Sequence, residues 1–173
     1  MDGVIKALMN RKSIRSFTGE AVDKESVDIL LKAAMAAPSA MNSQPWVYIV
    51  VDDAATKDAL ADKLPYAKML KSAGVGIVIC GDLSRALPSP MTDFWIQDCS
   101  AATENLLLAA EALGLGAVWT GVHPNPAAIN AVRSVIDLPE NIIPFCVIPV
   151  GHPAANPAPK DKYDASKVHW NNW

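Results

Sequence analysis

The segment 94–113 constrains the fold more than any other part of the chain, because it reads as one long helix with apolar side chains almost all round. Its centre, LLLAAEAL, offers no continuous polar face. Such a helix must be covered on most sides, which requires other elements around it. Asp98, Glu104 and Glu111 lie within it and would be costly in lipid, so we expect a buried helix and not a membrane span.

Strands and helices alternate along the rest of the chain. Helices are predicted at 4–9, between a capping Asp23 and Pro38, at 53–63, at 66–72 and at 126–136. Strands are predicted at 46–51, 74–82, 117–121 and 142–151. The strand 142–151 contains prolines, which place it near a sheet edge or lie at strand ends. The loop 83–93 is rich in proline and serine and is expected to form a surface flap. The pattern predicts one α/β or α+β domain over residues 1–173.

The composition favours a well-packed core and an interface. Hydrophobic residues make up 51% of the 173 residues and charged residues 19%, so disorder is not expected. The mean hydropathy of +0.17 is high for one small domain, and we expect the excess apolar surface to lie in a subunit interface. The tail 152–173 has no apolar periodicity but carries Trp170 and Trp173. We expect this extended tail to pack on a partner subunit.

Charge and cysteine usage exclude several classes of function. The formal net charge of -3 argues against nucleic acid as a partner, which would require a broad basic face. Cys80, Cys99 and Cys146 are far apart in apolar surroundings and are expected to be reduced, buried thiols. The three histidines share no spacing that suits a metal. No signal-peptide pattern opens the sequence, so a cytoplasmic protein is the default expectation.

Positive charge is nevertheless concentrated in the run NRKSIRSF, which contains Arg11, Lys12, Ser13 and Arg15. Arg11, Ser13 and Arg15 alternate, so they project to one side of an extended segment. Guanidinium groups, a hydroxyl and backbone amides together suit a phosphate monoester. The alternative is a solvated loop between two helices.

Three further segments are candidates for binding. The loop APSAMNSQPW is polar and constrained by prolines, and its amides suit the edge of a heterocycle, although its side chains could instead satisfy turn backbone. ALGLGAVWTGV allows close approach of backbone to a flat ligand, but it is not a dinucleotide fingerprint and also reads as a helix cap followed by a strand. PAPKDKYD places Lys160 and Lys162 near the chain end, where a solvated tail is the alternative.

In this order, the four segments resemble the flavin-dependent nitroreductase family, and the resemblance extends from Arg11 to Trp170. Its most specific part is the spacing between RKSIRSF and APSAMNSQPW. The resemblance implies an α+β, three-layer α/β/α fold, with a central, mainly antiparallel sheet flanked by helices. It also implies an intertwined homodimer that binds FMN at its interface.

The resemblance assigns roles to individual residues of this sequence. Arg11 and Ser13 look like contacts to the FMN phosphate, Lys12 would add its backbone or a second cation, and Arg15 would lie beside the pyrimidine edge of the flavin. The loop that covers the flavin from the other subunit corresponds to Pro38, Ser39, Ala40, Met41 and Asn42. Thr120 and Gly121 match the backbone next to flavin N5, while Lys160 and Lys162 complete the phosphate site. Lys162 stands where the family commonly has arginine, which forgoes a bidentate contact.

The implied activity is that of an FMN-dependent NAD(P)H oxidoreductase. NADH or NADPH would deliver a hydride to flavin N5, and a small aromatic acceptor such as a nitroaromatic or a quinone would then take its place, in ping-pong fashion. No side chain is expected to act as catalytic acid or base, and His123 is expected to be structural. Two alternatives remain: a flavin-binding module without turnover, and a relative that removes halogen or fragments flavin. The short flap 83–93 leaves the substrate unassigned.

Overall fold

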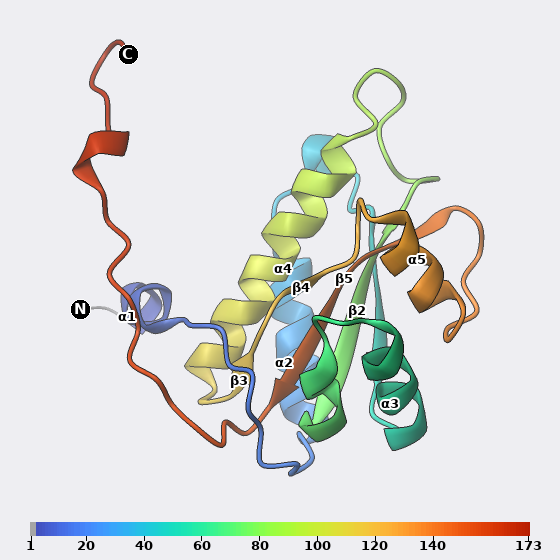
Figure 1. The fold of residues 1–173 in the computed structure, drawn as a ribbon. Coiled ribbons are helices and arrows are strands. Elements are labelled where there is room, and N and C mark those ends of the chain that lie inside the picture. Colours follow the sequence, from blue (N-terminus) through green and yellow to red (C-terminus); the bar gives the residue numbers. More distant parts are fainter. Residues whose placement is uncertain (1–2) are drawn as a thin grey trace.

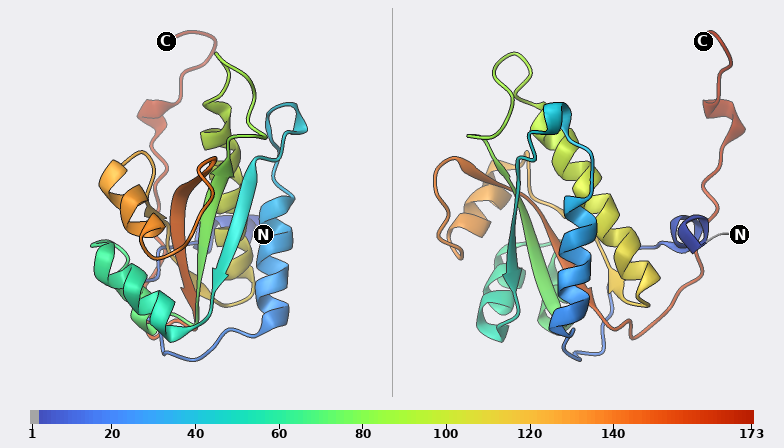
Figure 2. Two further views of the ribbon diagram at one scale, coloured as in Figure 1. Left: turned by 90° about the vertical axis from the view of Figure 1, so that its right-hand side faces the viewer. Right: turned by 180° about the vertical axis from the view of Figure 1, so that it is seen from behind.

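The computed structural model describes residues 3–173, and its core is a sheet between two layers of helices (Figures 1 and 2). The strands are β1 (Trp46–Val51), β2 (Val75–Asp82), β3 (Gly116–Ala117), β4 (Thr120–Gly121) and β5 (Ile142–Gly151). The α-helices are α1 (Gly3–Asn10), α2 (Lys24–Met35), α3 (Ala54–Lys63), α4 (Phe94–Ala112) and α5 (Pro126–Arg133). Short 3₁₀ helices are η1 (Ala40–Asn42), η2 (Lys68–Ser72) and η3 (Ala165–Lys167).

Alternation along the strands explains the three layers. On β2, Ile77 and Ile79 pack against α2 and α4, whereas Val78 and Cys80 pack against α3, η2 and α5. Successive side chains of a strand point to opposite faces, so a strand buried on both sides must be apolar throughout. The run VGIVIC meets this requirement. The predicted three-layer fold is confirmed.

The sheet has the order β1-β2-β5-β3, with β4 also paired to β5, and all these pairs are antiparallel. β5 is therefore an inner strand that lies next to the edge formed by β3 and β4, and its two prolines lie two residues inside its ends, within the paired part of the strand. Pro144 is accommodated by a bulge, because the register on β5 advances from Cys146 to Pro144 while β2 advances by one residue. A bulge is one of the few interior positions that tolerate proline.

Pro149 explains why the predicted strand 117–121 is split into β3 and β4. Both pieces pair with β5 in one continuous register, Ala117 with Val150 and Thr120 with Val147. Pro149 lies between them and has no N–H to donate, so only the bond from Val118 N to Pro149 O, at 3.3 Å, remains there. The ladder is interrupted opposite the proline.

The helix α4 is buried on most sides, as its composition predicts. Eight of its residues are buried, and it packs against α2, the sheet and α1. Asn105 Nδ2 donates to the Ala33 carbonyl at 3.1 Å and so ties α4 to α2. Among residues 3–173, no helix combines the length and the apolar character needed to cross a membrane.

The three cysteines are buried and free, as predicted. Burial raises the pKa of Cys80 and of Cys99 to about 12, and the nearby Asp98 carboxylate adds to the effect on Cys99. Burial also raises the pKa of Cys146. At neutral pH these groups are thiols and not thiolates, so they act as small apolar side chains of the core.

Gly81 provides a direct test of the contact between α4 and the sheet. A Cβ atom at this position would lie 2.7 Å from Cζ3 of Trp95, whose ring stacks edge-on with Phe145 and His123. We expect Gly81→Ala to displace α4 and to lower the free energy of unfolding by about 2–3 kcal/mol, measured by urea denaturation. Gly121→Ala is the matched control, since its Cβ meets no atom within 4 Å. Equal stability of the two variants would contradict this packing.

Candidate functional site

The basic run is held in place as an extended segment beside β3. Ser13 forms a parallel bridge with Ala117, and Ile14 N donates to the Ala117 carbonyl at 3.0 Å. The side chain of Ile14 is buried and lies over Gly116, where a Cβ atom would be 2.6 Å from Ile14 Cγ2. Because neighbouring side chains of an extended segment alternate, burial of Ile14 turns Ser13 and Arg15 away from the core.

The start of the C-terminal tail is tied to the same segment. Phe17 is buried and forms an antiparallel bridge with Pro153, while Thr18 N donates to the His152 carbonyl at 3.0 Å and Ala154 N donates to the Ser16 carbonyl at 2.9 Å. The tail then runs past the basic run. Both chain ends therefore meet at one place on the molecule.

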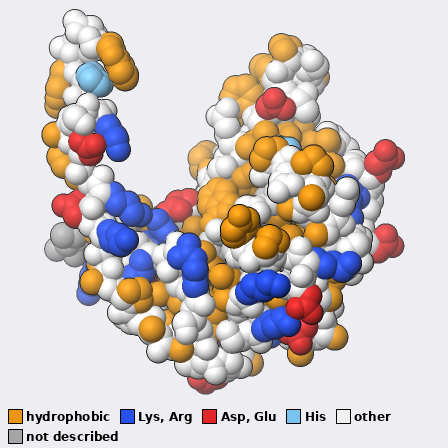
Figure 3. All heavy atoms as spheres, in the orientation of Figure 1, with side chains coloured by type: hydrophobic (Ala, Val, Ile, Leu, Met, Phe, Trp, Pro, Cys, Tyr) orange, Lys and Arg blue, Asp and Glu red, His pale blue; other side chains and the backbone are white. Residues whose placement is uncertain are grey.

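A cavity of 260 Å³ lies at this meeting point. It is lined by Arg11, Lys12, Ser13, Arg15, Pro157, Ala158, Lys160 and Lys162. We call this cavity the basic cradle. Figure 3 shows the lysine and arginine side chains gathered where the tail leaves the body of the protein. The structure thus brings together the five residues that the sequence proposes for the phosphate, with Arg15, proposed for the pyrimidine edge, beside them, and cations around a hydroxyl suit a dianion.

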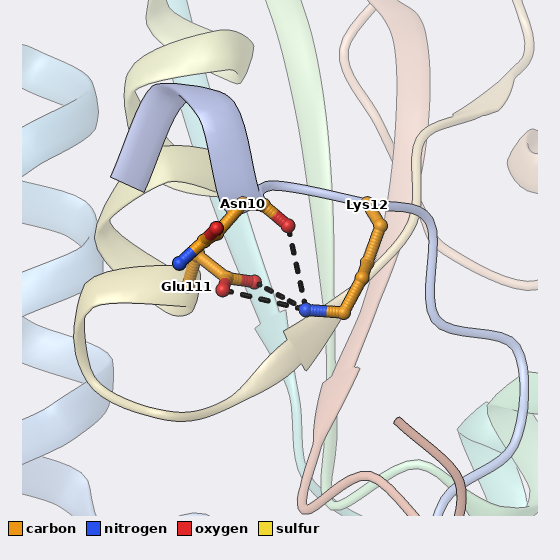
Figure 4. A network of polar contacts seen from close by, with 3 residues as sticks. All are labelled: Asn10, Lys12 and Glu111. Carbon is orange, nitrogen blue, oxygen red and sulfur yellow. Dashed lines mark hydrogen bonds and ion pairs between the residues drawn. The ribbon is translucent and has the colours of Figure 1, made fainter. Parts of the chain in front are cut away.

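Two cations of the basic cradle are already paired with carboxylates of α4. Arg11 Nε lies 2.8 Å from Glu104 Oε1. Lys12 Nζ lies 3.3 Å from Glu111 Oε2 and also donates to the Asn10 carbonyl at 3.3 Å (Figure 4). From the sequence alone, both glutamates are charges within a helix with no assigned partner. Their positions seven residues apart, on one face of a helix, were the available signal.

The loop 38–45 is locally strained, and a buried carboxylate of α4 is one of the contacts that hold it. Met41, Asn42 and Gln44 adopt φ values of 52°, 55° and 48°, which non-glycine residues rarely do. Asp98, which is 6% exposed, accepts a hydrogen bond from Ala40 N at 2.9 Å. The Ser39 hydroxyl oxygen accepts from Gln44 N at 3.0 Å, so this side chain does satisfy turn backbone.

This loop lines a shallow hollow of its own, away from the basic cradle. The hollow measures 390 Å³ and is lined by Pro38, Ser39, Ala40, Phe94, Gln97, Asp98 and Ala101. Asp98 lies near the first turn of α4, and Glu111, which binds Lys12, lies at its last turn. Glu104, which binds Arg11, lies six residues after Asp98, and Glu111 lies thirteen residues after it, which correspond to roughly 9 Å and 20 Å along the helix at 1.5 Å per residue. One chain therefore keeps the two predicted parts of the site apart.

Thr120 and Gly121 occupy a third position. Thr120 donates through its hydroxyl to the Val147 carbonyl at 2.6 Å, so its side chain is used in the sheet. Gly121 is exposed and its backbone is open to approach. The two residues line a cavity of 110 Å³ with Tyr66 and Asn125, for which the sequence predicts no role in a site. Tyr66 is 81% exposed, and an exposed aromatic beside a glycine-containing strand was the signal missed.

His123 follows this strand and packs against an aromatic side chain, and its Nδ1 is buried without a hydrogen-bond partner within residues 3–173. Its ring packs edge-on against Trp95 with a centroid distance of 4.8 Å, and partial burial lowers the pKa of the imidazole below its usual value. A neutral ring in aromatic surroundings is consistent with a packing role. Within residues 3–173, no cluster of three or more histidine, cysteine, aspartate or glutamate side chains could hold a metal ion.

Comparison with known proteins gives a consistent result over nearly the whole chain. The family model described as Nitroreductase family matches residues 8–65 and 60–152. A provisionally named NADH dehydrogenase/NAD(P)H nitroreductase from Methanothermobacter thermautotrophicus is 42% identical over 170 residues, which cover 98% of this chain and 87% of that protein.

Solved structures agree with this match. A crystal structure of a provisionally named NADH dehydrogenase/NAD(P)H nitroreductase from Parabacteroides distasonis has a TM-score of 0.94 and 44% identity, and the match covers all of both chains. A provisionally named nitroreductase from Desulfovibrio desulfuricans, crystallised in complex with FMN, has a TM-score of 0.84 and 32% identity, covering 100% of this chain and 99% of that one.

The role of Asp98 as the anchor of the loop 38–45 can be tested directly. We expect Asp98→Ala to leave the Ala40 N–H without its acceptor, to speed hydrogen exchange at this amide and to lower the free energy of unfolding by about 1–2 kcal/mol. Asp98→Asn keeps an acceptor oxygen and is the matched control. Exchange at Ala40 that is equally slow in wild type and Asp98→Ala would show that the loop is fixed by other contacts.

Proposed function

The chain belongs to the nitroreductase family, and from this membership we propose that it is an FMN-dependent NAD(P)H oxidoreductase that reduces nitroaromatics, quinones or similar aromatic acceptors. The single observation that carries the proposal is the basic cradle, in which cations from both chain ends surround one cavity. An acidic protein with net charge -3 has no general need for such a concentration of charge. A local dianion explains it.

The residues of the basic cradle fit the phosphate of FMN. Arg11 provides a planar guanidinium, Ser13 an exposed hydroxyl, and Lys160 and Lys162 provide ammonium groups on a tail that passes over the same cavity. The Ser13 to Arg15 backbone is fixed by its contact with β3, so binding does not have to order it. Arg15 is exposed at the rim, where its charge would favour a negatively charged ring edge of the cofactor.

When bound, FMN supplies the redox chemistry, taking a hydride from NADH or NADPH and passing electrons to the acceptor. The contribution of this chain is to bind and orient the cofactor. Gly121 offers open backbone to the ring, and the adjacent Thr120 side chain is held in the sheet. No acid or base is assigned to a side chain, because a proton can reach a site of this openness from solvent. If NAD(P)H and the aromatic acceptor occupy the same face of the flavin ring in turn, the kinetics would be ping-pong.

We further propose that the functional unit is a homodimer in which each FMN site combines the basic cradle of one subunit with the loop 38–42 of the other. The separation of these parts along α4 supports this arrangement. The tail supports it as well, because every residue from Ala154 onward is exposed, and Trp170 and Trp173 are 84% and 100% exposed (Figure 1). Uncovered tryptophans of this kind are typical of a segment that packs on a partner.

Anaerobic titration tests the activity and separates it from a binding module. We expect the FMN-loaded protein to be yellow, to lose its visible absorption within seconds of adding NADH or NADPH under nitrogen, and to regain it on adding a nitroaromatic or a quinone. A protein that binds FMN but stays yellow with both pyridine nucleotides would indicate a flavin-binding module without turnover. A protein that is bleached but recoloured only by a halogenated aromatic would indicate dehalogenase chemistry.

The shared site predicts complementation between two defective chains. Arg11→Ala damages the basic cradle and Asp98→Ala damages the loop, so each homodimer is expected to bind FMN weakly. Random pairing on co-expression makes half of the dimers mixed, and each mixed dimer holds one site with neither defect. We expect about a quarter of all sites to bind FMN with wild-type affinity, measured by fluorescence titration.

The opposite result is equally clear. If cradle and loop of the same chain formed each site, every site in the mixture would carry one defect. No wild-type sites would then be recovered. FMN bound by a protein that light scattering shows to be monomeric would contradict the dimer as well.

A further inference from the structure

The cations of the basic cradle are not equivalent. Arg11 and Lys12 each face a carboxylate of α4, whereas Arg15, Lys160 and Lys162 have no ion-pair partner within residues 3–173. Arg11 and Lys12 are adjacent in sequence, but their side chains make different kinds of contact. The difference lies in how many donors each pairing leaves free.

Lys12 directs its ammonium group at acceptors of the protein itself. Its ammonium group has three N–H donors and makes three contacts: to the Asn10 carbonyl at 3.3 Å, to Glu111 Oε1 at 3.4 Å and to Glu111 Oε2 at 3.3 Å (Figure 4). The pair is well covered, with side-chain exposures of 15% for Lys12 and 19% for Glu111. The contact joins the N-terminal segment to the last turn of α4.

Arg11 keeps donors for an anion. Its ion pair with Glu104 is made through Nε, at 2.8 Å, and the guanidinium has two further nitrogens with four N–H groups. The same side chain lines the basic cradle. A carboxylate at Nε restricts the rotation of a long side chain, and a fixed guanidinium binds a phosphate oxygen pair at a lower entropic cost.

We propose that Glu104 is a positioning residue that orients Arg11 toward the flavin phosphate, whereas Glu111 holds Lys12 away from it. The proposal rests on the function proposed above. It deepens that function by assigning the phosphate to Arg11, Ser13, Lys160 and Lys162, and by giving Lys12 the separate task of fastening the basic run to α4.

The two possible effects of Glu104 on FMN have opposite signs. Through charge alone, a carboxylate weakens the binding of a neighbouring dianion, so removal of the charge would increase the affinity for FMN. Through positioning, removal of the carboxylate frees Arg11 and weakens FMN. The sign of the change therefore distinguishes the two effects.

The test is a double-mutant cycle on FMN dissociation constants, measured by fluorescence titration of the apoprotein. We expect Glu104→Met to weaken FMN about tenfold in the wild-type background and to have no further effect in an Arg11→Ala background. Glu104→Gln keeps an acceptor oxygen for Arg11 Nε, so we expect it to lose less affinity for FMN than Glu104→Met. Tighter binding by Glu104→Met, or an equal loss in both backgrounds, would overturn the positioning role.

Glu111 provides the contrasting arm. We expect Glu111→Met to release Lys12, so that FMN binds as tightly as in wild type or a few-fold more tightly, while the melting temperature falls. Weakening of FMN as large as that in Glu104→Met would overturn the separate task given to Lys12. Glu140→Met is the matched control, since Glu140 is exposed and has no ion-pair partner within residues 3–173.

Failure of this proposal can be told apart from failure of the proposed function. If Arg11→Ala leaves the FMN dissociation constant unchanged, the phosphate assignment itself is wrong. If Arg11→Ala weakens FMN and Glu104→Met does not, the phosphate site stands and only the positioning role is lost.

Discussion

The pairing of the extended segment 13–18 with β3 on one side and the start of the tail on the other holds the functional surface together. Ile14 packs over Gly116, and Phe17 packs beside Gly151, where a Cβ atom would lie 3.1 Å from the Phe17 ring. Both contacts require glycine on the sheet side. They fix residues 13–18 and the start of the tail next to each other, so the fold itself holds the backbone of the basic run in place. Preorganisation of this kind lowers the cost of binding an anion.

Charge in this protein is organised locally, and the whole-chain balance conceals it. Five cations line one cavity in a chain of net charge -3, and two of them are neutralised by the carboxylates of α4. The same helix that fills the core thus presents acidic side chains to the basic run. Glu104 and Glu111 explain how a dense cluster of positive charge is tolerated on an isolated subunit, where like charges repel.

Much of the fold could be predicted because the deciding signals are local. Asp23 and Asp53 cap helices through hydrogen bonds of 2.8 Å to Ser26 N and Thr56 N, and continuous apolar runs form the buried strands. The inner position of β5 could not be predicted, because Pro144 and Pro149 are accommodated by a bulge and by a break in a neighbouring strand. Both features depend on partners distant in sequence.

The residues of the candidate site that follow from local sequence signals could likewise be predicted, whereas those that depend on distant contacts could not. Arg11, Ser13 and Arg15 follow from alternation within one segment, and the structure places them with Lys160 and Lys162 in one cavity. The acidic partners of Arg11 and Lys12 come from a helix about 100 residues away, and only tertiary packing brings them close.

The length of α4 is also the physical basis of the proposed homodimer. The helix holds the strained loop 38–45 through Asp98 near its start and the basic run through Glu104 and Glu111 farther along, so it spaces the two parts along its axis. Two such helices packed in opposite directions about a two-fold axis would bring the first turn of one beside the last turn of the other. A longer or shorter helix would shift one part past the other. In such a dimer the core element of the subunit would also set the spacing of the shared site.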